Sequence, residues 1–259
     1  MDANKDLDSK ILTKDIIGTK VAATTYAQTI SQISNWARLR DRPYLVAAAN
    51  THVLSLARNN HEYRKVIDAF DLVVPDGMPL VWVLNRKYNQ ALKDRVYGPT
   101  LMEKTFQRSQ DQQHNHLRHF LLGSSDEIRS NLRKNLEERF PKAKIVGDYS
   151  PPFGTWTESD NRKTIDLIQA VKPNIVWTCY GCPKQETWLA HHRSSLPSAV
   201  YLGIGAAFAF HAGKVKMAPR FLQNIGMEWA FRLACEPKRL FRRYLVNNLR
   251  FLFYLSTEK

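Results

Sequence analysis

The sequence has only three cysteines in 259 residues, and it contains no long hydrophobic run. Three cysteines do not make a framework of disulfide bonds, which favours a reducing, cytoplasmic setting. The longest nearly unbroken apolar segment, Ala199–Phe210, has 12 residues and includes two glycines, whereas a transmembrane helix needs roughly 20. We therefore expect no membrane span. Residues 1–20 also lack the apolar stretch of a secretory signal.

The residue patterns that hold metal ions are scarce as well. Asp6-x-Asp8 is the one pair of carboxylates at alternating spacing, and it lies in the polar first 20 residues. An enzyme that binds a diphosphate through a divalent ion needs such a pair at the end of a strand. The eight histidines form no metal-spaced set. We predict no metal and no other cofactor. Basic side chains, with Arg95 and Lys184 as candidates, and helix ends would meet the charge of a phosphorylated ligand; the alternative for both residues is an ordinary surface charge.

Positive charge is abundant. The 38 Lys and Arg residues outnumber the 24 Asp and Glu residues, and the net charge of +14 implies an anionic partner. Residues 214–250 hold nine basic and two acidic residues, so this segment alone has a net charge of +7. It is also rich in aromatic residues. We predict that residues 214–259 form a basic, aromatic, helical appendage that associates with an anionic membrane surface. Two alternatives are a nucleic-acid-binding tail and a helical cap whose aromatic residues belong to the core.

Short apolar strands alternate with helices over most of the chain. The strands are predicted at residues 44–49, 72–74, 120–122, 144–148, 174–178 and 199–204. Strands joined by single helices are typical of a parallel sheet with right-handed connections. We predict the α/β class: a Rossmann-like, mostly parallel sheet with helices on both faces, formed by residues 21–213. Residues 1–20 are predicted to be a mobile or loosely docked arm.

The segment Asp71–Trp82 places one carboxylate at a position where ligands bind. Leu72, Val73 and Val74 form a short buried strand, which Pro75 ends because proline cannot donate a hydrogen bond to a neighbouring strand. The turn Asp76-Gly77 and a helix that opens with Met78-Pro79 follow. Asp76 therefore lies at the carboxyl end of a strand, where open α/β sheets bind ligands. The alternative is that Asp76 is only a turn residue or the N-cap of the helix. Asn50, at the end of the strand 44–49, can cap a helix in the same way.

Three further turns between a strand and a helix contain glycine. They are Gly123-Ser124-Ser125, Gly181-Cys182-Pro183 and Gly203-Ile204-Gly205. Free N–H groups at helix N-termini attract phosphate, and glycine allows a ligand to approach the backbone. The third glycine of the dinucleotide fingerprint is missing. Three such turns in one sheet of a basic chain nevertheless favour a nucleotide-type ligand. The rigid loop Tyr149-Ser-Pro-Pro-Phe follows another predicted strand.

The motif Cys179-x-x-Cys182-Pro183 suggests a different function. It lies between a strand and a helix, as in a thioredoxin-type redox site, where the helix N-terminus lowers the pKa of a thiol. The motif occurs late in a chain that is far longer than such a domain. A redox function is therefore the less favoured alternative.

Read together, several blocks resemble the bacterial WecG/TagA/CpsF glycosyltransferase family, over about Tyr44 to Phe253. The blocks are Asn50 with His52, PDGMPLVW in Asp71–Trp82, Arg95-Val-Tyr-Gly-Pro, Phe120-Leu-Leu-Gly, Tyr149-Ser-Pro-Pro-Phe, Gly181-Cys-Pro-Lys-Gln-Glu, Gly203-Ile-Gly-Ala-Ala-Phe, Glu228-Trp229 and Glu236-Pro-Lys-Arg-Leu. The resemblance implies an inverting, metal-independent transfer of a sugar from a UDP-sugar to a polyprenyl-diphosphate-linked sugar. In the best-understood branch, N-acetylmannosamine is transferred to undecaprenyl-diphosphate-N-acetylglucosamine. Such transfers serve cell-surface polysaccharide or teichoic acid synthesis on the cytoplasmic face of the bacterial membrane.

The resemblance also implies roles for individual residues. Asp76 is the expected general base, Gln185 is expected near the reacting sugar, Arg95 near the donor diphosphate and Asn50 in the pocket. The remaining candidates for substrate binding are Gly77, Gly123, Tyr149, Gly181, Lys184 and Gly205. The candidates for contact with the membrane or the acceptor are Arg232, Arg239, Arg242 and Arg243. Ala48 departs from the threonine often found two residues before the asparagine, which leaves the identity of the sugar open. We expect no nucleic-acid partner and allow for a homo-oligomer.

Overall fold

A six-stranded parallel sheet forms the centre of the computed structural model, which describes residues 11–257 except for the side chains of residues 220, 224, 239 and 242–245. The strand order is β4-β3-β8-β7-β5-β6, and every neighbouring pair is parallel. The strands are β3 (Tyr44–Ala49), β4 (Leu72–Pro75), β5 (Arg118–Gly123), β6 (Lys144–Tyr149), β7 (Ile175–Cys179) and β8 (Val200–Gly203). The predicted parallel sheet is confirmed, and the predicted strands match the observed ones to within two residues.

Alternate residues of each strand point to opposite faces of the sheet, and both faces are buried. In β7, Val176 belongs to one hydrophobic cluster, whereas Ile175 and Trp177 belong to the other. Leu45 and Val46 of β3 divide in the same way. Burial on both faces explains why these strands are nearly continuous apolar runs in the sequence.

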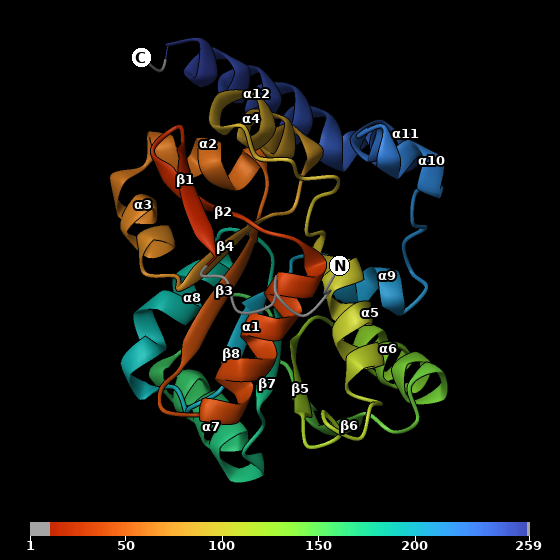
Figure 1. Cartoon of the computed structure of the whole chain (residues 1–259). Coiled ribbons are helices and arrows are strands. Elements are labelled where there is room, and N and C mark those ends of the chain that lie inside the picture. The colour runs from red at the N-terminus through yellow and green to blue at the C-terminus, as the bar shows by residue number, and fades with distance from the viewer. Residues whose placement is uncertain (1–10, 258–259) are drawn as a thin grey trace.

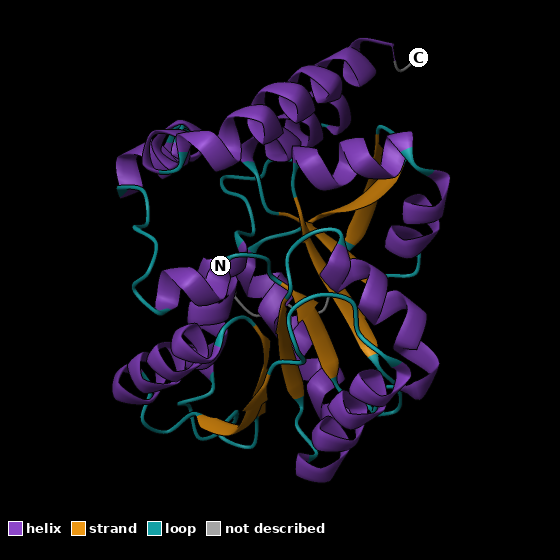
Figure 2. Cartoon of the chain, turned by 180° about the vertical axis from the view of Figure 1, so that it is seen from behind, coloured by secondary structure: helices purple, strands orange, loops and turns teal. Residues whose placement is uncertain are grey.

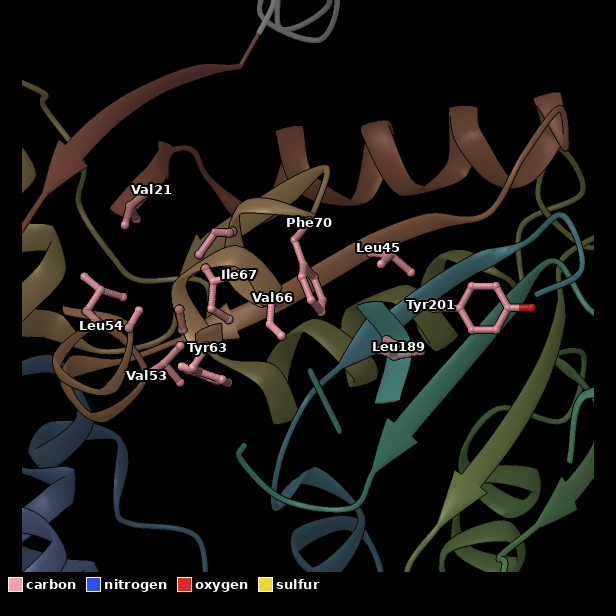
Figure 3. Packing of buried hydrophobic residues seen from close by; sticks show 14 of the residues in the cluster. Val21, Leu45, Val53, Leu54, Tyr63, Val66, Ile67, Phe70, Leu189 and Tyr201 are labelled. Atoms are coloured by element: carbon pink, nitrogen blue, oxygen red, sulfur yellow. The ribbon is translucent and has the colours of Figure 1, made fainter. Parts of the chain in front are cut away.

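Helices cover the two faces, as Figure 2 shows. The first cluster receives residues from α2 (Thr51–Asn59), α3 (His61–Asp68), α4 (Met78–Tyr88), α7 (Glu158–Val171) and α8 (Lys184–His192), which the short 3₁₀ helix η1 (Arg193–Ser195) follows. The second receives residues from α1 (Tyr26–Leu39), α5 (Gly98–Arg108), α6 (Asp126–Arg139) and α9 (Ala207–His211). Figure 3 shows part of the first cluster, to which Tyr63, Val66 and Ile67 of α3, Leu45 of β3 and Leu189 of α8 all belong. The predicted Rossmann-like arrangement is therefore confirmed.

The segment before α1 differs from the predicted mobile arm wherever the structure describes it. Residues 12–23 form an antiparallel hairpin of β1 (Leu12–Ile16) and β2 (Thr19–Ala23), with Gly18 in the turn at a φ of 83°. Ile16 and Val21 are fully buried in the first cluster. Their burial depends on contact of the hairpin with β4 and α3, which local sequence does not reveal. Residues 1–10 lie outside the described residues.

The C-terminal segment is helical, with α10 (Arg220–Asn224), α11 (Glu228–Cys235) and α12 (Pro237–Thr257). α12 lies across the end of the molecule at which α2 and α4 lie (Figure 1). Two hydrogen bonds join it to α2: Thr51 Oγ1 donates to Asn248 Oδ1 at 2.8 Å, and Ser55 Oγ donates to the carbonyl of Asn247 at 3.3 Å. Phe251 is only 2% exposed and belongs to the first cluster. Part of this segment therefore belongs to the hydrophobic core, as in the alternative of a helical cap with core aromatic residues.

No helix within residues 11–257 combines the length and the apolar character that crossing a bilayer requires.

Candidate active site

The carboxyl ends of the six parallel strands meet at one edge of the sheet, and most of the predicted ligand-binding residues lie along it. Ligands of open α/β sheets bind at this edge. The residues at the strand ends or within two residues after them are Asn50 (β3), Asp76 and Gly77 (β4), Gly123 (β5), Tyr149 (β6), Gly181 (β7) and Gly205 (β8). Residues that are up to 155 positions apart in the chain thus share one edge because all six strands run in the same direction.

A pocket lies between this edge and the C-terminal helices, with an empty volume of about 860 Å³ that includes space open to solvent. Its core side includes Asn50, His52, Asp76, Gly77, Arg95 and Tyr97. Its other side includes Glu228, Trp229, Arg232, Asn247 and Asn248, from α11 and α12. The C-terminal helices therefore complete the pocket that Asp76 faces.

Asp76 is held by backbone groups of two neighbouring segments. Its N–H donates to the carbonyl of Ala49 at 2.8 Å, and its carboxylate Oδ1 accepts from the N–H of Gly98 at 2.8 Å. A Cβ at position 98 would lie 3.0 Å from the carbonyl oxygen of Ile204 and 3.6 Å from Asp76 Oδ1, so glycine lets this loop approach the carboxylate. The N-cap of α4 is Gly77, and no side chain caps that helix. Asp76 is therefore not a helix cap.

Asn50 orients the second carboxylate oxygen. Its Oδ1 accepts from the N–H groups of His52 and Val53, at 3.1 and 3.4 Å, and so caps α2 as the sequence predicts. Because the cap uses the oxygen of the amide, the Nδ2 donors are directed away from the helix. Nδ2 lies 3.4 Å from Asp76 Oδ2, a long contact that leaves this oxygen weakly engaged. The cap thus determines which atom of Asn50 faces Asp76.

Burial raises the pKa of the Asp76 carboxyl above its ordinary value. The Gly98 N–H, the positive charge of Arg95 and the amide of Asn50 act in the opposite direction, whereas the negative charge of Glu228 raises the pKa further. Burial has the largest effect. It raises the pKa because it disfavours the charged form of the carboxyl. A carboxyl with a raised pKa that faces a pocket has the character of a proton acceptor or donor.

Arg95 makes a buried ion pair with Glu228 of α11. The side chains are 8% and 6% exposed, and the guanidinium of Arg95 also lies 4.3 Å from the centre of the Tyr97 ring. Arg95 is therefore not an ordinary surface charge. Sequence reasoning missed Glu228 as a site residue and counted it only against the basic residues around it, although Glu228-Trp229 is one of the blocks of the family resemblance.

Gln185 and Lys184 do not line the pocket that Asp76 faces. Gln185 is 2% exposed and packs beneath Gly203 at the end of β8, where its Nε2 donates to Glu186 Oε1 at 2.7 Å. Its Oε1 is buried and has no hydrogen-bond partner among the residues that the structure describes. Lys184 Nζ donates to the carbonyl of Gly154 at 2.5 Å and lies 4.0 Å from the centre of the Trp156 ring. These two residues therefore belong to a different stretch of the same edge.

The cysteines lack the character that a redox site requires. Burial raises the pKa of the Cys179 thiol to about 12, and its Sγ donates to the carbonyl of Gly205. A thioredoxin-type site needs a thiol with a lowered pKa. No disulfide joins Cys179, Cys182 and Cys235. The geometry therefore does not support the redox alternative.

The basic residues predicted to contact the membrane or the acceptor divide into two groups. Arg232 lines the pocket, and its guanidinium lies 5.3 Å from the centre of the Phe210 ring. Arg239, Arg242 and Arg243 belong to α12, but their side chains lie outside the described part of the structure.

Among the described residues, no three His, Cys, Asp or Glu side chains are grouped closely enough to hold a metal ion.

Comparisons with known proteins agree on one family. The model of the glycosyl transferase WecG/TagA/CpsF family matches residues 14–259. Two similar proteins come from Staphylococcus aureus strains MRSA252 and NCTC 8325. Each is 26% identical over 229 residues, which cover 88% of this chain and 87% of the relative. Both carry the name N-acetylglucosaminyldiphosphoundecaprenol N-acetyl-beta-D-mannosaminyltransferase.

Proposed function

The chain belongs to the WecG/TagA/CpsF family of glycosyl transferases, and we propose that it transfers a sugar from a UDP-sugar to an undecaprenyl-diphosphate-linked sugar. N-acetylmannosamine, or a related hexose, is the proposed sugar, and N-acetylglucosamine is the proposed sugar of the acceptor. The names of the Staphylococcus aureus relatives support both choices. Ala48 in β3 stands where a threonine is often found in the family, so the identity of the transferred sugar is left open.

One observation carries the mechanism: the Asp76 carboxylate faces the pocket with one oxygen fixed and the other weakly engaged. We propose that Asp76 accepts the proton of the acceptor hydroxyl. The hydroxyl oxygen then forms a bond to C1 of the donor sugar, the bond from C1 to the phosphate oxygen breaks, and UDP leaves with the electron pair. Attack on the face opposite the leaving group inverts the configuration at C1. The proton passes from Asp76 to solvent when the product leaves.

UDP departs more readily where positive charge is already in place. Arg95 is the proposed partner of the donor diphosphate, and Arg232 lies on the opposite side of the same pocket. The turns at Gly123, Gly181 and Gly205 supply backbone N–H groups farther along the edge, and Gln185, Lys184 and Tyr149 are proposed to hold the rest of the donor there. Because these side chains and helix ends can meet the diphosphate charge, we propose a transfer that needs no metal ion.

A coupled assay of UDP release tests the proposed reaction. We expect the purified chain to release UDP when it is given UDP-N-acetylmannosamine together with a synthetic N-acetylglucosamine-diphosphate-lipid, and to keep this activity in EDTA. Omission of either substrate should reduce the release to background. A panel of other UDP-sugars identifies the donor, and NMR of the product reports the configuration at C1. Retention of configuration, or release of UDP without the acceptor, would contradict the proposal.

We also propose that the enzyme works as a peripheral protein on the inner face of the bacterial membrane, where its lipid-borne acceptor would lie. The C-terminal segment has the charge for this position, and Phe221, Ile225, Phe241 and Phe253 are each at least 58% exposed. Basic residues near an anionic surface attract it, and aromatic residues suit the interface.

Neutralising Arg239, Arg242 and Arg243 together, by substitution with Gln, should weaken binding to anionic vesicles. At about 1 kcal/mol for each basic residue near the surface, the loss is about 3 kcal/mol, or roughly 150-fold in affinity. Sedimentation with phosphatidylserine vesicles measures the effect. The matched control replaces Lys142, Lys144 and Arg162, which are exposed residues outside the C-terminal segment, with Gln. Equal losses in the two triple variants would show that only net charge matters and would remove the proposed role of α12.

A further inference from the structure

A second hollow of the molecule is an apolar groove between α4 and the C-terminal helices, with an empty volume of about 1310 Å³ that includes space open to solvent. Among the residues whose side chains the structure describes, thirteen line it; ten of these are apolar and one, Arg86, is charged. Figure 1 shows α12 extending along the side of the molecule that α4 occupies.

The groove is built from matching faces of its helices. α4 contributes Pro79, Trp82, Val83 and Arg86, at intervals of three, one and three residues, so these positions share one face of the helix. α12 contributes Phe241, Leu249, Leu252 and Leu255 from one of its faces. The hydrogen bond from Thr51 to Asn248 holds that face of α12 at the start of α2. The apolar surface therefore results from the docked fold.

Large side chains of the groove remain in contact with solvent. Trp82 is 51% exposed, Phe241 58%, Leu249 58% and Leu252 61%. A contiguous apolar patch of this kind is typical of a binding surface.

The groove opens from the pocket that Asp76 faces. Thr51, Pro79, Trp82, Trp229 and Asn248 line both. Polar and charged residues, among them Asp76, Arg95 and Arg232, are at the pocket end, and apolar residues are at the other. A lipid-linked sugar has the same order along its length: a sugar, then a diphosphate, then a hydrocarbon chain. When the sugar hydroxyl lies at Asp76, the hydrocarbon chain extends into the groove.

We propose that this groove binds the first isoprenyl units of the polyprenyl acceptor, lifted out of the bilayer. The inference rests on the proposed function, because it takes the position of the acceptor sugar from Asp76. If the groove binds the acceptor in this way, affinity depends on the length of the prenyl chain. A prenyl chain long enough to enter the groove removes apolar surface from water, and a shorter one does not.

Soluble prenyl diphosphates test the groove without a membrane and without catalysis. We expect the full chain to bind the 15-carbon farnesyl diphosphate at least tenfold more tightly than the 5-carbon isopentenyl diphosphate in calorimetry below the critical micelle concentration. Leu252→Asn should remove most of this difference by weakening the binding of the 15-carbon probe alone. The matched control is Leu39→Asn on α1, since Leu39 is 63% exposed and lies outside the groove. Leu249→Asn provides a second groove variant.

The outcomes separate the groove from the other possibilities. Equal affinity of the unaltered chain for the two probes overturns the proposal, and so does a Leu252→Asn variant that behaves like Leu39→Asn. A loss on both probes overturns it too, because Leu252 would then act through the diphosphate site or the fold. Weaker sedimentation with vesicles at unchanged affinity for farnesyl diphosphate would assign Leu252 to membrane contact. If the length preference holds but no sugar-nucleotide is consumed, the groove stands and the proposed function fails.

Discussion

Replacing Asp76 with asparagine is expected to reduce kcat by roughly 10²- to 10⁴-fold, the usual contribution of a positioned general base. Asparagine has nearly the same shape, and its amide oxygen can still accept the hydrogen bond from the Gly98 N–H. It cannot take a proton from the acceptor hydroxyl. The variant should therefore fold, bind UDP with unchanged affinity and fail at the chemical step. Single-turnover transfer and calorimetry with UDP provide the two measurements.

The matched control for this prediction is Asp166→Asn, which makes the same change at an exposed position of α7. It should leave kcat unchanged. If Asp76→Asn retained full activity, or if it lost UDP binding together with activity, Asp76 would not be the base.

The pH dependence of the unaltered enzyme provides a second check on Asp76. Burial raises the pKa of this carboxyl, and only the deprotonated form accepts a proton. We expect kcat/KM to fall on acidification through a pKa above that of an exposed aspartate. Stability should change with pH in the direction opposite to activity. Because the pKa of Asp76 is raised in the folded state, its contribution to the unfolding free energy is fully present below its unfolded pKa. That contribution is lost as the pH rises through its folded pKa.

Breaking the Arg95–Glu228 ion pair should be the most destabilising change at the pocket. Glu228→Gln leaves the buried guanidinium of Arg95 without its counter-charge, and removal of one partner of a buried pair costs about 3–5 kcal/mol of unfolding free energy. Replacement of both partners by apolar residues of similar size, Arg95→Met with Glu228→Leu, should recover most of the loss because no unpaired charge remains. Urea unfolding followed by circular dichroism measures both variants.

A surface pair provides the comparison. Glu138→Gln removes the partner of Lys134 in α6, where the side chains are 63% and 73% exposed and 4.0 Å apart. Its cost should stay within about 1 kcal/mol. A cost this small for Glu228→Gln, or a double variant as unstable as the single one, would contradict the interpretation. Because Glu228 belongs to α11 and Arg95 precedes α5, the same comparison measures how much this ion pair contributes to holding the C-terminal helices against the rest of the chain.

The parallel sheet and the position of Asp76 were predictable from the sequence because their causes are local. Leu72–Val74 is an apolar run that proline ends, and an Asp-Gly turn and a helix start follow. Repetition of this unit predicts a parallel sheet, and a parallel sheet brings the ends of its strands to one edge. The position of Asp76 there, and the cap that Asn50 makes on α2, follow from residues no more than a few positions away.

Other features depend on residues far apart in the chain, whose partners no local pattern identifies. The hairpin at residues 12–23 is ordered through its contacts with β4 and α3. Gln185 and Asp76 follow parallel strands, but packing against Gly203 keeps Gln185 away from the pocket of Asp76. The partner of Arg95 lies 133 positions later in the chain.

By itself, the sequence determined the fold class, the strand edge on which the site lies and the carboxylate that faces it, since turn chemistry and apolar periodicity act over neighbouring residues. Only the tertiary structure decided that α11 and α12 close the pocket, that Glu228 pairs with Arg95 and that an apolar groove leads away from Asp76. Those features arise where surfaces of distant segments meet. The free energy gained by burying those surfaces depends on how the segments pack together and not on any one stretch of the chain.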